Sequence, residues 1–301
     1  MKLKFLVILL LFGGLCLFTA VANADIIAEF EDAGTAGVDT VPGALGDGWR
    51  GAWNLNSSGT GSKSRVLGTS DPLYVDSNNY LDAAISDTGA DGYSCSLNRR
   101  YYLTSLNDDY YISYSIRFDD LSIWTDLDET NGNTSDRFYL SNTSAADYSH
   151  QTTRTGWAIR VCGNNATEDY EQAYQFRFLS SATGPGSTSS EYSGADVTVQ
   201  EDHVYRLVVA VHNGNHTYEA TVTDETTGKS YTSSTLNMEA QINADYLYFG
   251  TEHRNQGGST LAYSVDNVVI SNTAPVMVPE PSTLVLLAGA LVGLLVWRKR
   301  K

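Results

Sequence analysis

Carboxylate pairs are the residues in this chain whose spacing could most directly support a reaction. Two acids on one strand face can act as nucleophile and general acid in glycoside hydrolysis. Glu29 and Glu31 share one face of a predicted strand, but no third acid follows on that strand. Glu168, Asp169 and Glu171 cluster in a loop-like stretch where they do not alternate. The acids therefore do not predict a hydrolase, although a site built from separate strands stays open.

The histidines offer metal or nucleophile chemistry, and their spacing supports neither. His212 and His216 flank a tight turn and could approach each other, but no third metal ligand is evident beside them. Two solvated turn histidines are the simpler interpretation. The sequence also contains no Ser-His-Asp spacing, phosphate-binding loop or dinucleotide fingerprint. We therefore predict no catalytic residues.

Calcium is the metal that the acids fit best. Glu31 and Asp32 end the first predicted strand and Asp266 lies on the last, so the three carboxylates meet if these strands are neighbours. Calcium takes about six to eight oxygen ligands, which carboxylates and loop carbonyls can supply. We predict a structural calcium site at these residues. The alternative is that Asp266 and Asn267 are ordinary exposed strand residues.

The elements that must position these groups are strands. Apolar and aromatic residues alternate with polar ones at period two, and no comparable stretch keeps the helical period. Two Gly/Ser-rich stretches, 54–64 and 180–194, are predicted to be loops. About a dozen short strands in some 250 residues favour one two-sheet sandwich. The predicted strands are 26–31, 94–102, 110–118, 137–141, 156–162, 174–179, 205–211, 217–223, 246–251 and 263–271.

Aromatic residues are the remaining binding signal, because the chain has 19 tyrosines and 5 tryptophans. Exposed Tyr and Trp rings stack on sugars, combining an apolar body with a polar tip. The alternative is that the tryptophans belong to the core and the tyrosines cover sheet faces. The candidates for an exposed role are Trp49, Trp53, Trp124, Tyr170 and Tyr192.

The first 24 residues have the order of a secretory signal peptide. Lys2 and Lys4 precede an apolar run over residues 5–18, and Ala22-Asn23-Ala24 supplies a small-x-small cleavage site. We expect export across the inner membrane and maturation before Asp25.

The last 30 residues have the order of a linker, a membrane helix and a basic stop. A linker over 272–282 carries a Pro-rich motif, and an uncharged apolar run over 283–297 follows it. The helix predicted over 283–301 can span a bilayer, with its basic end in the cytoplasm and residues 25–271 outside. The motif is Val278, Pro279, Glu280 and Pro281, and the basic stop is Arg298, Lys299, Arg300 and Lys301.

This tail resembles the PEP-CTERM sorting signal of bacterial surface proteins. The resemblance rests on the motif 278–281, the apolar run and the basic cluster, and covers only the end of the chain. It implies recognition by an exosortase-type transpeptidase, cleavage near the motif, and delivery to the cell surface or an extracellular matrix. The alternative is an ordinary single-pass anchor with a Pro-rich stalk.

The exported region is strongly acidic. The whole chain has 19 basic and 35 acidic residues; without the six basic residues of the two terminal segments and without Glu280, 13 and 34 remain, a net charge near −21. Phosphate binding needs a cationic face, so this charge argues against nucleic acid and anionic lipid as partners.

The exported region keeps two of the three cysteines. Cys95 and Cys162 both lie in strand-like sequence, and an even number of cysteines in an oxidising compartment favours a disulfide between them. The alternative is a pair of buried thiols.

The order of the strands is similar to the concanavalin A-like, laminin-G-like jelly-roll family. The similarity rests on 26–32 (IIAEFED), the hairpin over 204–231 and the closing strand 263–271 (YSVDNVVIS). It implies an all-β, two-sheet antiparallel sandwich whose first and last strands lie side by side. Hydrolases of that fold carry Glu-x-Asp-x-x-Glu on one strand, and this triplet is missing here.

These observations predict an exported, non-catalytic protein that binds or organises extracellular polysaccharide. A purely structural envelope or matrix protein making protein contacts is the alternative from another class. A polysaccharide hydrolase or lyase is the third.

Overall fold

The structure is a computed structural model, and the statements below concern the residues that it describes. These are 26–28, 49–50, 53–58, 62–68, 73, 80–86, 93–125, 137–146, 150–163, 174–181, 189–253 and 260–275.

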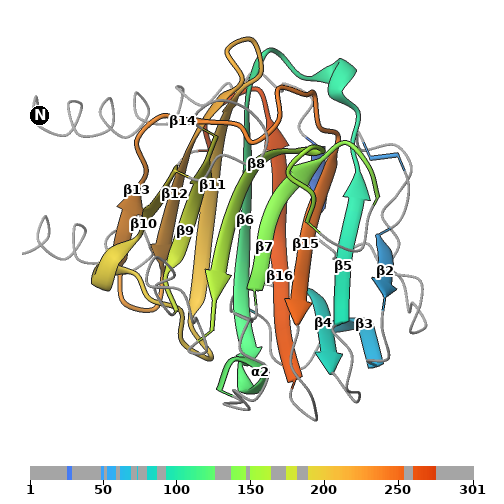
Figure 1. Cartoon of the computed structure of the whole chain (residues 1–301), viewed down its shortest axis with the longest axis vertical. Coiled ribbons are helices and arrows are strands. Elements are labelled where there is room, and N and C mark those ends of the chain that lie inside the picture. Colours follow the sequence, from blue (N-terminus) through green and yellow to red (C-terminus); the bar gives the residue numbers. More distant parts are fainter. Residues whose placement is uncertain are drawn as a thin grey trace, which may run out of the picture.

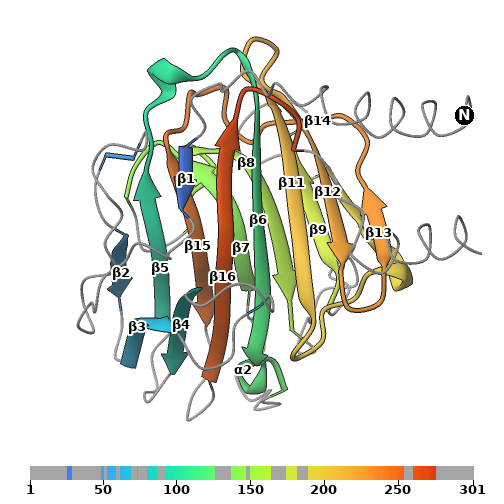
Figure 2. The same ribbon diagram turned by 180° about the vertical axis from the view of Figure 1, so that it is seen from behind.

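These residues form two antiparallel sheets that stack face to face (Figure 1, Figure 2). The nine-stranded sheet runs in the order β13 (Lys229–Thr232), β12 (Thr217–Asp224), β11 (Val204–His212), β6 (Asp109–Asp120), β16 (Thr260–Ser271), β4 (Tyr80–Ser86) and β3 (Ser62–Gly68). Two short strands complete it: β1 (Ile26–Ala28) pairs with β16, and β14 (Leu236–Asn237) pairs with β12. The seven-stranded sheet runs β10 (Ser189–Tyr192), β9 (Phe176–Ser180), β8 (Thr155–Cys162), β7 (Arg137–Thr143), β15 (Tyr246–His253), β5 (Tyr93–Arg100) and β2 (Asn54–Ser58).

Helical structure among the described residues is limited to short turns. These are the four-residue helix α2 (Ser122–Thr125) and the 3₁₀ turns η1 (Leu103–Ser105) and η3 (Gly194–Asp196). The prediction of an all-β, two-sheet antiparallel jelly-roll sandwich is therefore confirmed.

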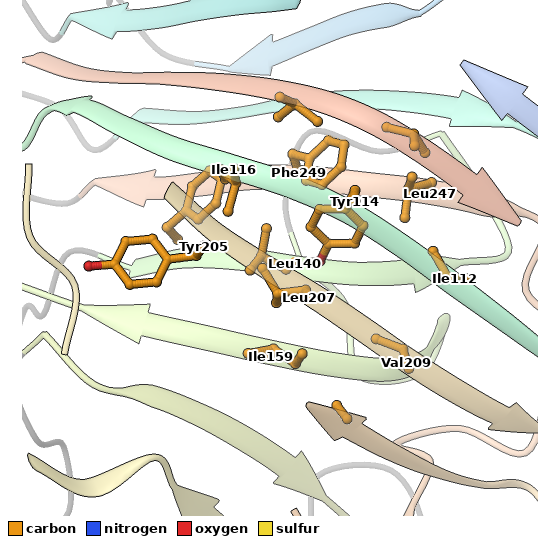
Figure 3. Close-up of a cluster of buried hydrophobic side chains, with 14 of the residues drawn as sticks. Ile112, Tyr114, Ile116, Leu140, Ile159, Tyr205, Leu207, Val209, Leu247 and Phe249 are labelled. Carbon is orange, nitrogen blue, oxygen red and sulfur yellow. The ribbon is translucent and has the colours of Figure 1, made fainter. Parts of the chain in front are cut away.

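The core lies between the two sheets and is built by period-two alternation. Along β11 and β12 every second side chain is buried, and on β6 Ile112, Tyr114 and Ile116 point inward while Arg117 lies on the opposite face. Side chains from both sheets meet in this layer (Figure 3). Burial of each large apolar side chain contributes about 1.5–3 kcal/mol, so the alternation fixes which face of each strand turns inward.

The described tryptophans belong to this core. Trp49, Trp53, Trp124 and Trp157 are each at most 1% exposed. Trp49 and Trp53 lie 5.9 Å apart between ring centroids, and the guanidinium of Arg99 lies 4.3 Å from the Trp49 ring. The core interpretation is therefore confirmed for Trp49, Trp53 and Trp157. Trp124 also lies in the core and not at an exposed, sugar-stacking position, because the sandwich needs these large side chains to fill its interior.

The first and last strands of the sandwich are neighbours, as the jelly-roll resemblance implied. Ile26 pairs with Ile270 and Ala28 pairs with Val268. The register between β16 and β6 shifts between Asp266 and Val269, where Asn267 has a φ of 52°. A bulge of this kind bends the strand locally and re-aims the residues beside it.

The stretch 54–64 was predicted to be a loop, and that prediction is wrong. Residues Asn54–Ser58 form β2 and pair with β5, and β3 begins at Ser62 and pairs with β4. Both strands stand at a sheet end, so they have a backbone partner on one side. Backbone hydrogen bonds can hold such a strand without the alternating apolar side chains that sequence analysis looks for.

The predicted disulfide between Cys95 and Cys162 is not formed; the structure contains two separate buried cysteines. Cys95 lies in the core on β5, whereas Cys162 pairs with Arg137 at the end of β8. Strands β15 and β7 separate β5 from β8, so the two Cα atoms are three strand spacings, or about 14 Å, apart. A disulfide needs Cα atoms less than about 7 Å apart.

The predicted terminal segments lie outside the described residues. This holds for the signal peptide 1–24, for most of the linker 272–282, and for the membrane segment 283–301. Within the ranges given above, no helix combines the length and apolar character that a membrane span requires.

Candidate functional site

The outer face of the seven-stranded sheet, turned away from the core, carries a continuous row of polar and aromatic side chains. One register line crosses all seven strands from β2 to β10. Its residues are Asn56, Ser96, Gly250, Tyr139, Arg160, Arg177 and Tyr192. Amide, hydroxyl, guanidinium and phenol groups donate and accept the hydrogen bonds that sugar hydroxyls need. Ser96, Tyr139, Arg160 and Arg177 in the middle of the row are each at most 7% exposed, and Asn56 and Tyr192 at its two ends are partly exposed. We call this row the polar face.

A tyrosine lies over the backbone at the centre of the polar face. A Cβ atom built on Gly250 would lie 2.1 Å from the hydroxyl oxygen of Tyr248 and 2.2 Å from its Cζ atom. Glycine is therefore required at position 250 so that the ring can cross the strand. Tyr248 forms a small buried cluster with Tyr139, Ala158 and Leu179.

His150 and Glu239 hold Tyr139, which lies on the neighbouring strand β7. The His150 ring stacks on Tyr139 with centroids 4.2 Å apart and planes 3° from parallel. His150 Nε2 lies 2.7 Å from Glu239 Oε2. Because Glu239 N–H also donates to the carbonyl of Gly156, this contact fastens the segment before β15 onto β8.

Two arginines lie side by side on the polar face. Arg160 and Arg177 are register partners on β8 and β9, and are 7% and 4% exposed. Arg160 lies 6.0 Å from the Tyr139 ring, and Arg177 lies 5.5 Å from the Tyr192 ring. Burial raises the pKa of Tyr192, although the charges of Arg177 and Arg160 act against this shift.

At one end of the polar face, five side chains form a partly exposed cluster that we call the end patch: Arg50, Arg100, Tyr102, Asp245 and Tyr246. Asp245 Oδ2 accepts a 2.6 Å hydrogen bond from Arg100 Nε and lies 3.6 Å from Arg50 Nη1. The hydrogen bond that Arg100 donates to Asp245 is the main reason that the pKa of Arg100 is raised.

Each arginine of the end patch also stacks on a tyrosine. The guanidinium carbon of Arg50 lies 4.8 Å from the Tyr102 ring, and that of Arg100 lies 5.4 Å from the Tyr246 ring. Cation–π contacts of this kind hold aromatic rings in place at a surface. Tyr102 is 42% exposed, the one large hydrophobic side chain among the described residues that is exposed.

The end patch has no signal in the sequence. Its residues come from three segments near positions 50, 100 and 245, which are brought together because Arg50 N–H donates to the Arg100 carbonyl and Tyr101 N–H donates to the Asp245 carbonyl. A sequence pattern could have placed Arg100 and Tyr246 on strands, but not beside each other.

Of the three predicted calcium ligands, Asp266 is the one that lies within the described residues. Asp266 is 1% exposed, so the alternative of exposed strand residues is wrong for Asp266, whereas Asn267 is exposed. The Oδ1 atom of Asp266 accepts the N–H of Asn267 at 2.7 Å. Glu31 and Asp32 lie outside the described residues. Within those residues, no group of three His, Cys, Asp or Glu side chains is placed to hold a metal ion. The sorting motif 278–281 and the basic stop 298–301 also lie outside them.

Acidic side chains gather instead on the outer face of the nine-stranded sheet. Asp119 accepts hydrogen bonds from Arg117 Nε at 2.5 Å and from Ser264 Oγ at 2.6 Å. Burial, followed by the charge of Asp119, raises the pKa of the neighbouring Asp82, and Arg117 acts against this shift.

Residues 278–301 match the PEP-CTERM protein-sorting motif. The predicted sorting motif at the end of the chain is therefore confirmed. No curated protein matches the sequence.

Several solved structures resemble the fold at low identity. The catalytic domain of a GH131 β-glucanase from Podospora anserina is 11% identical, with a TM-score of 0.45 over 71% of this chain and 80% of that one. Lectin II from Ulex europaeus is 10% identical, with a TM-score of 0.38 over 72% and 92%. The exoplasmic/lumenal domain of VIP36, in its Ca²⁺/Man3GlcNAc-bound form, is 11% identical, with a TM-score of 0.41 over 76% and 87%.

A sialidase is also matched, but this chain covers only 17% of its length. At these values the similarities carry no information about the ligand or the activity of this chain.

Proposed function

We propose that this protein is exported, sorted to the cell envelope or surface, and there binds or organises extracellular polysaccharide without catalysing a reaction. The observation that carries the binding proposal is the accessible edge of the polar face, where hydrogen-bonding groups lie beside tyrosine rings. Tyr192 and the tyrosines of the end patch offer partly exposed rings at its edges. Rings and polar tips in one surface are the means by which proteins hold sugars.

The localisation proposal rests on the sorting motif at 278–301. We propose that an exosortase-type transpeptidase recognises this tail and cleaves it near Val278–Pro281. Before cleavage, the helix over 283–301 anchors the protein in the inner membrane with residues 25–271 outside. The surface or the exopolysaccharide matrix is the final location.

The proposal that the protein is not an enzyme rests on the charges of the polar face. Glycoside hydrolysis uses two carboxyl groups about 5–10 Å apart. On the described strands of the polar face, one acid, Glu252, occupies a register position, opposite Arg137. The other strand positions carry arginine, serine, asparagine and tyrosine, which bind sugars but cannot serve as the second carboxyl. The two acids beside the face, Glu239 and Asp245, are engaged with His150 and Arg100.

We also propose a structural calcium ion near Asp266. Burial of this carboxylate is costly unless a cation or hydrogen bonds compensate it, and the first strand runs beside β16 so that Glu31 and Asp32 follow it along the chain. The proposal predicts that calcium raises the unfolding temperature of the full-length protein and that chelator lowers it. An unfolding temperature independent of both would contradict the site.

The binding proposal is tested by affinity electrophoresis of the full-length protein, purified in detergent, through gels that contain different polysaccharides. Retardation by at least one polysaccharide, without release of reducing ends, is the expected result. Release of reducing ends would favour a hydrolase, and of unsaturated sugar ends a lyase. The absence of any retardation would favour a structural protein that makes protein contacts only.

A further inference from the structure

We propose that the end patch is a binding subsite for an acidic sugar, a uronate residue of a carboxylated polysaccharide. This inference rests on the proposed polysaccharide binding and adds the chemical class of the ligand. The patch combines the two features that such a residue needs, a positive charge for its carboxylate and a ring for its pyranose face.

The positive charge is the excess of two guanidinium groups over one carboxylate. Arg100 is engaged with Asp245 through a hydrogen bond of 2.6 Å. Arg50 Nη1 lies 3.6 Å from the same carboxylate, which is too far for a hydrogen bond. The Arg50 side chain is 38% exposed, so its planar set of N–H donors faces solvent and can grip a carboxylate with two parallel hydrogen bonds.

The ring is Tyr102, which is 42% exposed. The Arg50 guanidinium lies over one face of this ring, 4.8 Å from its centroid, so a sugar meets the ring at its edge or at its other face. From the edge, the carboxylate on C5 of a uronate can reach the N–H donors of Arg50 while the C–H groups of the sugar ring contact Tyr102.

The charge of the rest of the exported region sharpens the inference. A net charge near −21 repels polyanions in general, so an acidic polymer must find a local cationic site to bind. The end patch is such a site, because its two guanidinium groups outnumber its one carboxylate. A neutral glucan would gain nothing from this charge.

The test compares one sugar backbone with and without its charge. Affinity of the full-length protein is measured for polygalacturonate and for its fully methyl-esterified form, with dextran as a neutral polymer of different backbone. We expect polygalacturonate to bind about tenfold or more tightly than the ester, because one charge-assisted pair is lost on esterification. The preference should shrink as salt is raised.

Variants assign the effect to the patch. Arg50→Gln should lower the affinity for polygalacturonate about tenfold and leave the ester unchanged, and Arg50→Lys should restore part of the loss. Tyr102→Ala should weaken both polymers. The charge-matched control is Arg206→Gln on β11, which lies on the outer face of the other sheet and should change neither affinity.

Equal affinity for polygalacturonate and its ester, or an equal loss for Arg206→Gln and Arg50→Gln, would overturn the inference. Binding of dextran alone would overturn it too but leave the proposed function standing. A protein that binds none of these polymers, and no other polysaccharide in the gel series, would refute both.

Discussion

The outer faces of the two sheets have opposite character, although both belong to one acidic domain. The polar face of the seven-stranded sheet carries four of the 13 basic residues of the exported region: Arg100, Arg137, Arg160 and Arg177. The outer face of the nine-stranded sheet carries acids at Asp82, Asp119, Glu219 and Asp266, against Arg117 and Arg206.

The difference teaches that net charge alone misjudges this surface. A net charge near −21 predicts a protein that avoids anions, yet the structure gathers its arginines with tyrosines on one sheet. The acidic sheet supplies solubility and repulsion, whereas the arginine-bearing sheet provides directional groups. Local placement of charge decides which ligand class can bind.

The largest effect that we expect comes from Gly250 on the polar face. Gly250→Ala places a Cβ atom in the space of the Tyr248 ring, so the ring must leave its position. We expect a loss of about 1–3 kcal/mol in the free energy of unfolding, measured by urea titration.

Two further variants isolate the cause. In a Tyr248→Ala background the same Gly250→Ala change should cost much less, because the clash has gone. Ser113→Ala on the outer face of the nine-stranded sheet should cost less than about 1 kcal/mol. A Gly250→Ala protein as stable as the parent would disprove the close packing of Tyr248 on this strand.

An intermediate effect is expected at Asp224, at the end of β12 in the nine-stranded sheet. Burial alone would raise the pKa of Asp224, but hydrogen bonds from Thr227 and His203 outweigh it and lower the pKa below its usual value. A carboxyl whose pKa is lower in the folded than in the unfolded state stabilises the fold above the unfolded value near 3.8. This stabilisation is lost as the pH falls through the folded pKa.

Asp224→Asn should therefore cost about 1–2 kcal/mol of unfolding free energy at pH 7, and progressively less as the pH falls below about 4. Urea titrations of both proteins at pH 7 and pH 3 measure this. A cost that stays constant between the two pH values would show that the charge of Asp224 is not what stabilises the turn.

The smallest effect is expected at the outer edge of the nine-stranded sheet. Thr221 Oγ1 and Thr232 Oγ1 lie 2.9 Å apart across β12 and β13. An exposed cross-strand pair of this kind contributes about 0.2–1 kcal/mol, so Thr221→Ala should shift the urea midpoint only slightly. A shift as large as that of Gly250→Ala would mean that the edge of the sheet, and not the polar face, is the sensitive region.

The sequence predicted those strands in which apolar and polar side chains alternate. The strands β11 and β12 follow the predicted stretches 205–211 and 217–223 to within a residue, because each buries every second side chain. The polar strand β2 was missed, because backbone pairing with β5 holds it in the sheet and its side chains do not alternate between apolar and polar.

The candidate site was largely beyond sequence analysis. The alternation within 174–179 is enough to place Arg177 on the face opposite Phe176 and Phe178, and the structure has this arrangement. Its position beside Arg160 depends on strand order, and the end patch depends on three distant segments. Period-two patterns assign a face to each residue but do not name the neighbouring strand.

Hydroxyl-radical footprinting of the full-length protein with and without polygalacturonate tests the central claim most directly. The account predicts that Tyr102 and Tyr246, at the end of the seven-stranded sheet, become protected from oxidation when the polymer binds. Tyr111, which lies on the outer face of the nine-stranded sheet and is partly exposed, should keep its oxidation rate. Protection of Tyr111 with no change at Tyr102 would contradict the account, because the polymer would then bind the outer face of the nine-stranded sheet.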